Sequence, residues 1–152
     1  MNKIRPFLWF DNQAEEAMNF YVSIFNNSEV LYVNPGPNGV AQSAGFVLAG
    51  QEFMAMNAGP QFKFNEAISL FVECKTQAEV DELWQKLTAD GGEESMCGWL
   101  KDKYGLSWQI IPTALGEILG HPDREKANRA VQAMLQMQKI VIADLQKAFD
   151  GD

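Results

Sequence analysis

Apolar and polar residues alternate along this chain with two different periods, one typical of strands and one typical of helices. The run at 4–10 is apolar, β-branched or aromatic, which predicts a buried strand. In residues 14–25 the apolar side chains recur at helical spacing, and Asp11 or Asn12 stands where a helix cap is expected. The chain is therefore predicted to open with a strand followed by an amphipathic helix.

Three more strands are predicted in the first half of the chain. One covers 30–33, and the Pro-Gly-Pro-Asn-Gly sequence at 35–39 makes a loop after it. The other two cover 44–48 and 52–57, and they form a hairpin because Ala-Gly at 49–50 is a turn sequence.

The second half repeats this order. A strand is predicted at 67–73, a helix begins at Thr76 and stops before Gly-Gly at 91–92, and a second hairpin spans 98–112.

Several residues also match between the two halves. Each helix opens on Gln-Ala-Glu, at Gln13 and at Gln77, and carries an aromatic residue seven positions later. Each hairpin contains glycine followed by an aromatic residue, at 45–46 and at 98–99. Matches in the same order indicate an internal repeat.

After residue 112 the pattern predicts helices only. Residues 113–119 form a short helix, and His121-Pro122-Asp123 opens a long one, since proline and acidic residues favour a first turn. Its apolar stripe continues to residue 149, with a bend expected near Lys139. This segment has no counterpart in the first half.

Charge and composition exclude several classes of function. The formal net charge is −8 and the 12 lysines and arginines are scattered, so the chain repels nucleic acid. No apolar run has the length of a membrane span, and no signal-peptide pattern precedes the first strand. Two cysteines, Cys74 and Cys97, do not make a disulfide framework. The sequence therefore predicts a cytoplasmic protein with free thiols and no membrane or nucleic-acid partner.

Three stretches are distinctive in combination: Pro-Phe-Leu-Trp-Phe-Asp at 6–11, Asn-Ala-Gly-Pro at 57–60, and the hairpin at 97–110. Together they resemble the PhnB-like family of the vicinal oxygen chelate superfamily, which includes glyoxalase I, extradiol dioxygenases and bleomycin-resistance proteins. The likeness extends over nearly the whole chain, the C-terminal helix included.

The resemblance implies an α+β fold of two βαβββ modules plus a C-terminal helical extension. Module one would cover 1–60, module two 66–112 and the extension 113–149, within one PhnB-like domain of 1–152. Each module would place its helix on one face of a four-stranded sheet and turn the other face toward a cavity.

Strand alternation and the resemblance together give ten candidates for a small-molecule pocket. The aromatic members suit a flat apolar ligand, and the alternative for each of them is plain core packing. The candidates are Arg5, Phe7, Trp9, Met54, Asn57, Phe62, Ser69, Phe71, Trp99 and Gln109.

Metal-dependent members of the superfamily place His or Glu at four inward strand positions. Here the corresponding positions hold Arg5 (or Ile4, if the register shifts by one), a residue near Met54, Ala67 and Gln109. Arginine and alanine offer no lone pair, and an amide oxygen binds transition metals poorly. We therefore expect no metal and no cofactor.

The other polar residues have structural explanations beside functional ones. Gln109 is expected to be hydrogen-bonded either by a ligand or by a neighbouring strand. Asp102 and Asp11 are placed to cap a turn and a helix, and His121 to sit at a helix start. Cys97 would need a neighbouring base to act as a nucleophile, and the single histidine lies outside both modules.

The function expected from these features is metal-free binding of an unknown small apolar or aromatic molecule. The alternatives are an enzyme of the 3-demethylubiquinone-9 3-methyltransferase or glyoxalase/dioxygenase kind, and a scaffold without a ligand. PhnB-like sequences often carry the methyltransferase label, yet this chain lacks the strand–helix alternation and glycine-rich turn usual for S-adenosylmethionine binding. A homodimer is expected from the resemblance.

Overall fold

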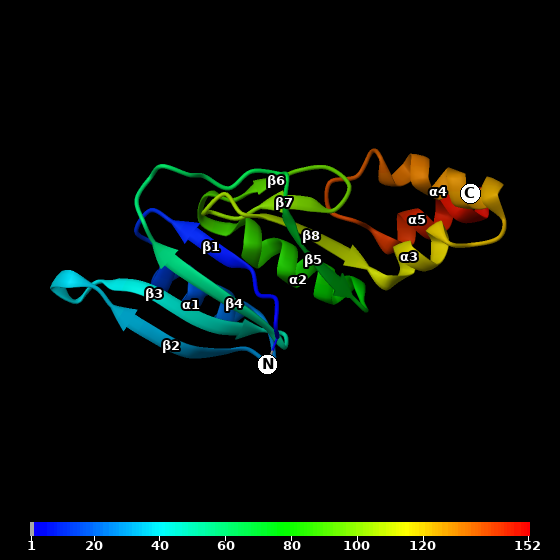
Figure 1. The fold of residues 1–152 in the computed structure, drawn as a ribbon. Helices are drawn as coiled ribbons and strands as arrows, with labels where there is room; N and C mark the ends of the chain where they lie inside the picture. Colours follow the sequence, from blue (N-terminus) through cyan, green and yellow to red (C-terminus); the bar gives the residue numbers. More distant parts are fainter. Residues whose placement is uncertain (1) are drawn as a thin grey trace. The chain divides into compact units, whose positions relative to one another are not determined.

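The computed structural model describes residues 2–152 and divides them into two compact units, the first ending at Lys63 and the second beginning at Phe64. Each unit contains a four-stranded sheet with a helix packed on it, and the second also carries the C-terminal helices (Figure 1). The predicted α+β class is therefore confirmed.

Unit one is a mixed sheet with one helix. Its strands are arranged β1-β4-β3-β2, with β1 parallel to β4 and the other neighbours antiparallel. In chain order the elements are β1 (Phe7–Phe10), α1 (Ala14–Ile24), β2 (Glu29–Pro35), the 3-10 turn η1 (Pro37–Gly39), β3 (Ala41–Leu48) and β4 (Gln51–Asn57).

The first strand is shorter than predicted. Ile4 lies before β1 and is 85% exposed, whereas the sequence pattern placed a buried strand from residue 4. Proline at position 6 has no N–H to donate, and its carbonyl accepts a hydrogen bond from the Met54 N–H at 2.9 Å. Regular pairing with β4 starts at Phe7.

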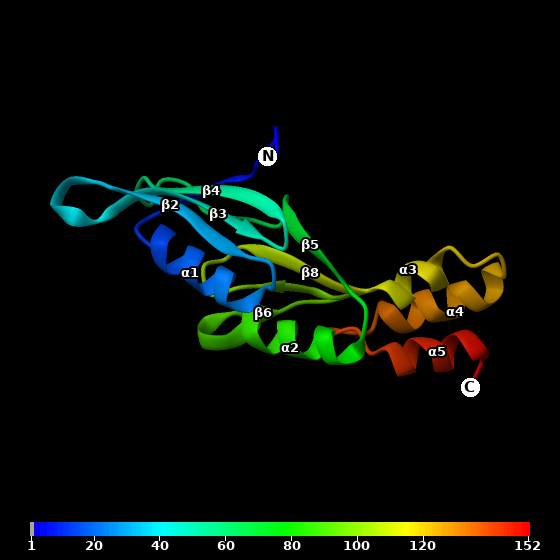
Figure 2. The ribbon, with the colours of Figure 1, turned by 90° about the horizontal axis from the view of Figure 1, so that it is seen from below.

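Helix α1 lies along one face of this sheet (Figure 2), and its apolar stripe is buried. The Tyr21 ring lies 6.5 Å from that of Phe46, which stacks on Phe53 at 5.5 Å. The buried stripe consists of Ala14, Ala17, Met18 and Tyr21. Because strand side chains alternate, every second residue points to the opposite side, which we call the open face of the sheet.

Unit two repeats the layout of unit one. Its sheet has the order β5-β8-β7-β6, with β5 parallel to β8 and the other neighbours antiparallel, so both halves show the same βαβββ connection. The elements are β5 (Ser69–Cys74), α2 (Gln77–Thr88), η2 (Ala89–Gly91), β6 (Glu93–Glu94), β7 (Trp99–Lys101) and β8 (Ser107–Pro112).

Helix α2 begins as predicted. The Thr76 side chain accepts a hydrogen bond from the Glu79 N–H at 3.1 Å, which satisfies a donor that the first turn leaves free. The predicted apolar face is buried, and it consists of Val80, Leu83, Trp84 and Leu87.

The C-terminal extension differs from the prediction of one long, bent helix. After α3 (Thr113–Leu119), it contains two helices, α4 (Arg124–Met134) and α5 (Ile142–Asp150), separated by the linker 135–141. The linker is not helical because its carbonyls bond elsewhere: Met137 O accepts from Cys97 N at 2.7 Å, and Gln138 O from Gly98 N at 2.8 Å.

The Gln77 side chain holds the end of this linker. Its Nε2 donates to Ile140 O at 3.0 Å, and its Oε1 accepts from Ile142 N at 2.7 Å, where α5 lacks a cap of its own. The linker is thus fixed to module two by backbone and side chain. No helix in the described part of the chain is both long and apolar enough to span a membrane.

Candidate functional site

The open face of the second sheet brings together four of the predicted pocket residues, namely Ser69, Phe71, Trp99 and Gln109. Register pairs Phe71 on β5 with Gln109 on β8, and Gln109 with Trp99 on β7. These three side chains therefore form one row across three neighbouring strands. Phe71 is 60% exposed, although an aromatic side chain is more often buried.

The next row of the same face is polar. Register places Ser107 on β8 between Ser69 on β5 and Lys101 on β7. Gln109 joins the two rows, because its Nε2 donates to Ser69 Oγ at 2.9 Å. The neighbouring-strand explanation for this amide is thus realised at its Nε2.

Ser107 is a polar residue of this face that the sequence reasoning did not single out. Its side chain is 1% exposed, and Oγ has no hydrogen-bond partner among the described residues. Strand alternation from Gln109 would have placed it on the open face. Its burial depends on the tertiary packing, which strand alternation does not encode.

Lys101 is already paired at the edge of this polar row. Its ammonium forms an ion pair with Glu66, and the hydrogen bond between them lowers the pKa of Glu66 and raises that of Lys101. Both groups are solvent-accessible, so the pair contributes little to stability.

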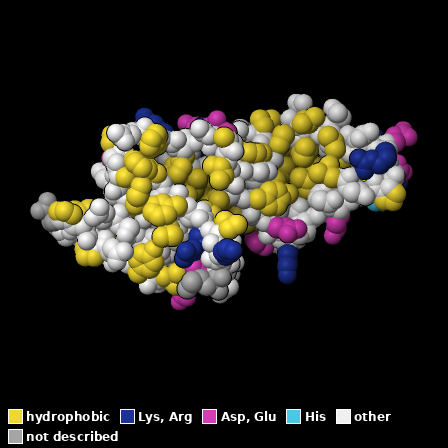
Figure 3. All heavy atoms as spheres, viewed as in Figure 1, with side chains coloured by type: hydrophobic (Ala, Val, Ile, Leu, Met, Phe, Trp, Pro, Cys, Tyr) yellow, Lys and Arg dark blue, Asp and Glu magenta, His cyan; other side chains and the backbone are white. Residues whose placement is uncertain are grey.

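The open face of the first sheet is mainly apolar. Phe7 pairs with Met54 and Trp9 with Met56, so aromatic and thioether side chains cover β1 and β4. Figure 3 shows hydrophobic side chains gathered over these two strands. Phe62, from the loop after β4, meets the Trp9 ring edge-on at 4.9 Å. The Trp9 indole N–H donates to Gly59 O at 2.9 Å, which leaves its ring as an apolar surface.

Two other candidates in this unit have structural contacts. Asn57 Oδ1 accepts from Ala14 N at 2.8 Å, and its Nδ2 donates to Ala41 O at 2.7 Å. Asn57 thereby supplies the helix cap that was expected from Asp11 or Asn12. Arg5 lies before β1 and pairs with Glu52 at 3.6 Å.

The side chains at the expected ligand positions do not suit a divalent cation. Module one offers the Arg5–Glu52 ion pair and a thioether at Met54, and module two offers the amide of Gln109. Ala67 precedes β5. No group of three or more His, Cys, Asp or Glu side chains that could hold an ion exists among residues 2–152.

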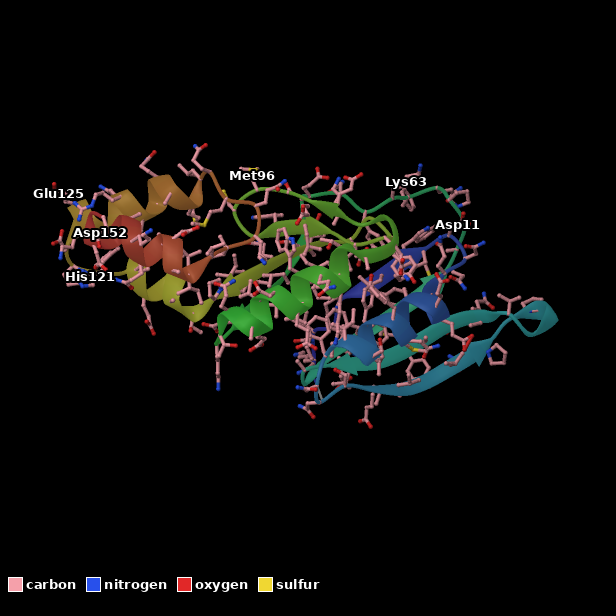
Figure 4. The ribbon with its side chains drawn as sticks, turned by 180° about the vertical axis from the view of Figure 1, so that it is seen from behind. Asp11, Lys63, Met96, His121, Glu125 and Asp152 are labelled. Atoms are coloured by element: carbon pink, nitrogen blue, oxygen red, sulfur yellow. The ribbon has the colours of Figure 1, made fainter. Side chains whose placement is uncertain are left out.

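Asp102 and His121 have structural roles. The Asp102 carboxylate is buried and accepts from the backbone N–H groups of Tyr104 and Leu106 and from the Trp108 indole N–H. His121 Nδ1 accepts from Asp123 N at 3.0 Å. Figure 4 shows His121 at the outer end of the helical extension, beside Glu125 and the C-terminal Asp152.

The two thiols are expected to differ in reactivity. Cys74 is fully buried, and burial, with a smaller contribution from Glu79, raises its pKa to about 12; Cys97 is partly exposed. At pH 8 iodoacetamide should alkylate Cys97 and leave Cys74 unmodified until urea unfolds the chain, as read by peptide mass spectrometry. Equal rates at both thiols in the folded chain would contradict this prediction.

The same shift has a consequence for pH dependence. The folded state keeps the Cys74 proton above its ordinary pKa of 9.0, whereas the unfolded state releases it. The contribution of the protonated Cys74 thiol to the free energy of unfolding is therefore complete below pH 9, and it is lost as the pH rises toward 12.

Comparison with known proteins gives the family. The family model described as 3-demethylubiquinone-9 3-methyltransferase matches residues 2–111. This chain belongs to that PhnB-like family. A PhnB protein from Bacillus cereus is 39% identical, with a TM-score of 0.69, over 73% of this chain and 99% of that chain.

More distant structures share the fold. A protein from Pseudomonas aeruginosa is 20% identical with a TM-score of 0.59, covering 74% of this chain and 98% of its own. The fosfomycin resistance protein FosX from Listeria monocytogenes is 19% identical with a TM-score of 0.60, covering 79% and 98%. No curated protein matches the chain.

The family model covers a shorter part of the chain than the resemblance was expected to cover. It ends at residue 111, so α3, α4 and α5 lie outside it, although the resemblance was expected to include the C-terminal helix. The family description also names a methyltransferase, yet neither sheet has the doubly wound parallel arrangement usual for S-adenosylmethionine sites.

Proposed function

We propose that this PhnB-like chain binds a small, flat, apolar or aromatic molecule on the open face of module two, without using a metal. The observation that supports this proposal is the row formed by Phe71, Gln109 and Trp99 across three adjacent strands. It combines two aromatic surfaces with one amide that can orient a ligand.

The geometry of a sheet sets the size of the ligand. Neighbouring strands are spaced by roughly 4.8 Å, so Phe71 and Trp99 stand about 10 Å apart with the amide between them. A two-ring aromatic molecule spans this distance. Burying Phe71, which is 60% exposed, would then add hydrophobic free energy to binding.

Gln109 supplies the polar contact in this arrangement. Its Nε2 is held by Ser69, which fixes the amide orientation and leaves Oε1 as a hydrogen-bond acceptor. A ligand hydroxyl or amine that donates to Oε1 would gain a directional contact beside two apolar ones. Binding sites commonly combine a mostly apolar lining with a few such polar groups.

We expect 2-naphthol to bind this row with a dissociation constant in the micromolar range. Titration should shift the NMR signals of the Trp99 indole and the Gln109 side-chain amide, while those of Trp84 and Trp108, both buried, stay in place. Phe71→Ala or Trp99→Ala should weaken binding at least about tenfold, since each removes roughly 1.5 kcal/mol or more of apolar contact.

A matched control is available in the same segment. Ile68 is 61% exposed and precedes β5, outside the row, so Ile68→Ala removes a similar apolar area without touching it. Equal weakening by Ile68→Ala and Phe71→Ala would reject the proposed row. Two other results would favour the alternatives. Thermal stabilisation by S-adenosylmethionine would favour the methyltransferase, and stoichiometric metal in the purified protein would favour a glyoxalase-like enzyme.

A further inference from the structure

Ser107 carries an unexplained hydroxyl beside the proposed site. Its Oγ is closed off from solvent and lacks a partner in the described part of the chain, while most buried polar groups are hydrogen-bonded. Leaving such a group unpaired costs roughly 1 to 3 kcal/mol. A ligand atom that pairs with it would recover this cost.

A second hydroxyl stands next to it. Ser69 and Ser107 are register partners on parallel strands, so their Cα atoms are about 5 Å apart. Because Ser69 Oγ accepts from Gln109 Nε2, its own proton can be donated to another acceptor. Two hydroxyl donors on adjacent strands suit one oxygen atom with two lone pairs lying between them.

The charges nearby favour a neutral oxygen over a carboxylate. Lys101, the next residue of this row, is already compensated by Glu66 and lies opposite Glu93 on β6. The chain as a whole carries a net charge of −8. Because Lys101 is already paired with Glu66, a ligand carboxylate finds no free positive charge in this row, whereas a ketone or amide oxygen needs only the two hydroxyl protons.

We propose that Ser69 and Ser107 together form a subsite for a carbonyl oxygen, so that the ligand of this face is a neutral aromatic ketone or amide. The inference rests on the proposed function and names its ligand class. Serine has a single rotatable side-chain bond with three staggered positions, so the Ser107 hydroxyl can turn without a backbone change. Because Ser107 is 1% exposed, a ligand that reaches it must also displace the side-chain atoms that now cover it.

Three probes that share one ring system and differ in one small group test this proposal. 2-Acetonaphthone carries a carbonyl where 2-ethylnaphthalene has a methylene group, and 2-naphthoate carries a carboxylate. We expect the ketone to bind at least tenfold more tightly than the hydrocarbon, and the carboxylate to bind more weakly than the ketone. Ser107→Ala and Ser69→Ala should each reduce the ketone's advantage to less than threefold.

Ser95→Ala is the matched control, because Ser95 is exposed and lies before β7 outside this row. It should leave the tenfold preference intact, and thermal melts would show that all three variants fold. An unchanged preference in both Ser107→Ala and Ser69→Ala, or tighter binding of the carboxylate, would overturn the subsite while hydrocarbon binding still supports the aromatic row. Binding of none of the three probes would reject the row and the subsite together.

Discussion

Gly98→Ala should destabilise the chain by about 3 kcal/mol, because an added methyl group meets both backbone strain and a crowded site. Gly98 has a φ of +85°, a region that disfavours residues with a Cβ. A Cβ there would also lie 2.7 Å from Ile111 Cδ1 and 3.1 Å from both Ile110 O and Ile140 Cγ1. The end of the Ile111 side chain can shift, but the Ile110 carbonyl belongs to the backbone of β8 and has little freedom to move.

Gly105→Ala separates the two contributions. Gly105 has nearly the same φ, +86°, but nothing lies within 4 Å of an added Cβ. Its substitution should therefore cost only the backbone strain, about 1 to 2 kcal/mol. Urea unfolding of both variants measures the difference. Equal losses would mean that β8 and the linker yield easily around Gly98, contrary to the packing described above.

Asp102→Asn should destabilise the chain by about 2 to 4 kcal/mol, although the two side chains have nearly the same shape. The carboxylate accepts from Tyr104 N and Leu106 N at one oxygen and from the Trp108 indole at the other. An amide has one oxygen, so either orientation turns its NH₂ group toward another donor. The buried site leaves no solvent to compensate this contact.

A double-mutant cycle with Trp108→Phe identifies the contact responsible. Once the indole N–H is absent, the amide can point its NH₂ group to that side, so Asp102→Asn should cost about 1 to 2 kcal/mol less. Asp11→Asn is the control at an exposed aspartate and should change stability by no more than about 0.5 kcal/mol. If Asp102→Asn lowers the free energy of unfolding equally in the Trp108 and Trp108→Phe backgrounds, the contact with the indole is not the cause.

Asp102 and Gly98 show that sequence and tertiary structure reveal different kinds of important residue. The role of Asp102 in a turn was predicted because aspartate at the start of a turn commonly caps backbone N–H groups, and a cap is a local interaction. Gly98 was noticed only as part of a repeated pair. Its importance arises because the linker residue Ile140 packs against it, and these residues are far apart in the chain.

The residues of the candidate site also divide into those that strand alternation placed and those that only the structure explains. Strand alternation made Phe7 and Phe71 candidates for a pocket, and in the structure both are exposed, whereas Leu8 and Phe10, which alternate with Phe7 along β1, lie in the core. Asn57 was taken for a pocket residue, yet its amide holds helix α1 and β3 through contacts with Ala14 and Ala41. An asparagine near a strand end fits either role, and only its neighbours in space decide between them.

The sequence by itself determined the repeated order of strands and helices and the alternating faces of the strands, because periodicity and turn residues act over short distances along the chain. Its motifs carried the resemblance to the family. The tertiary structure alone decided which residues share a row, how the linker splits the last helix, and that the Ser107 hydroxyl is buried without a partner. These features depend on strand register and on contacts between distant segments, which no local pattern encodes.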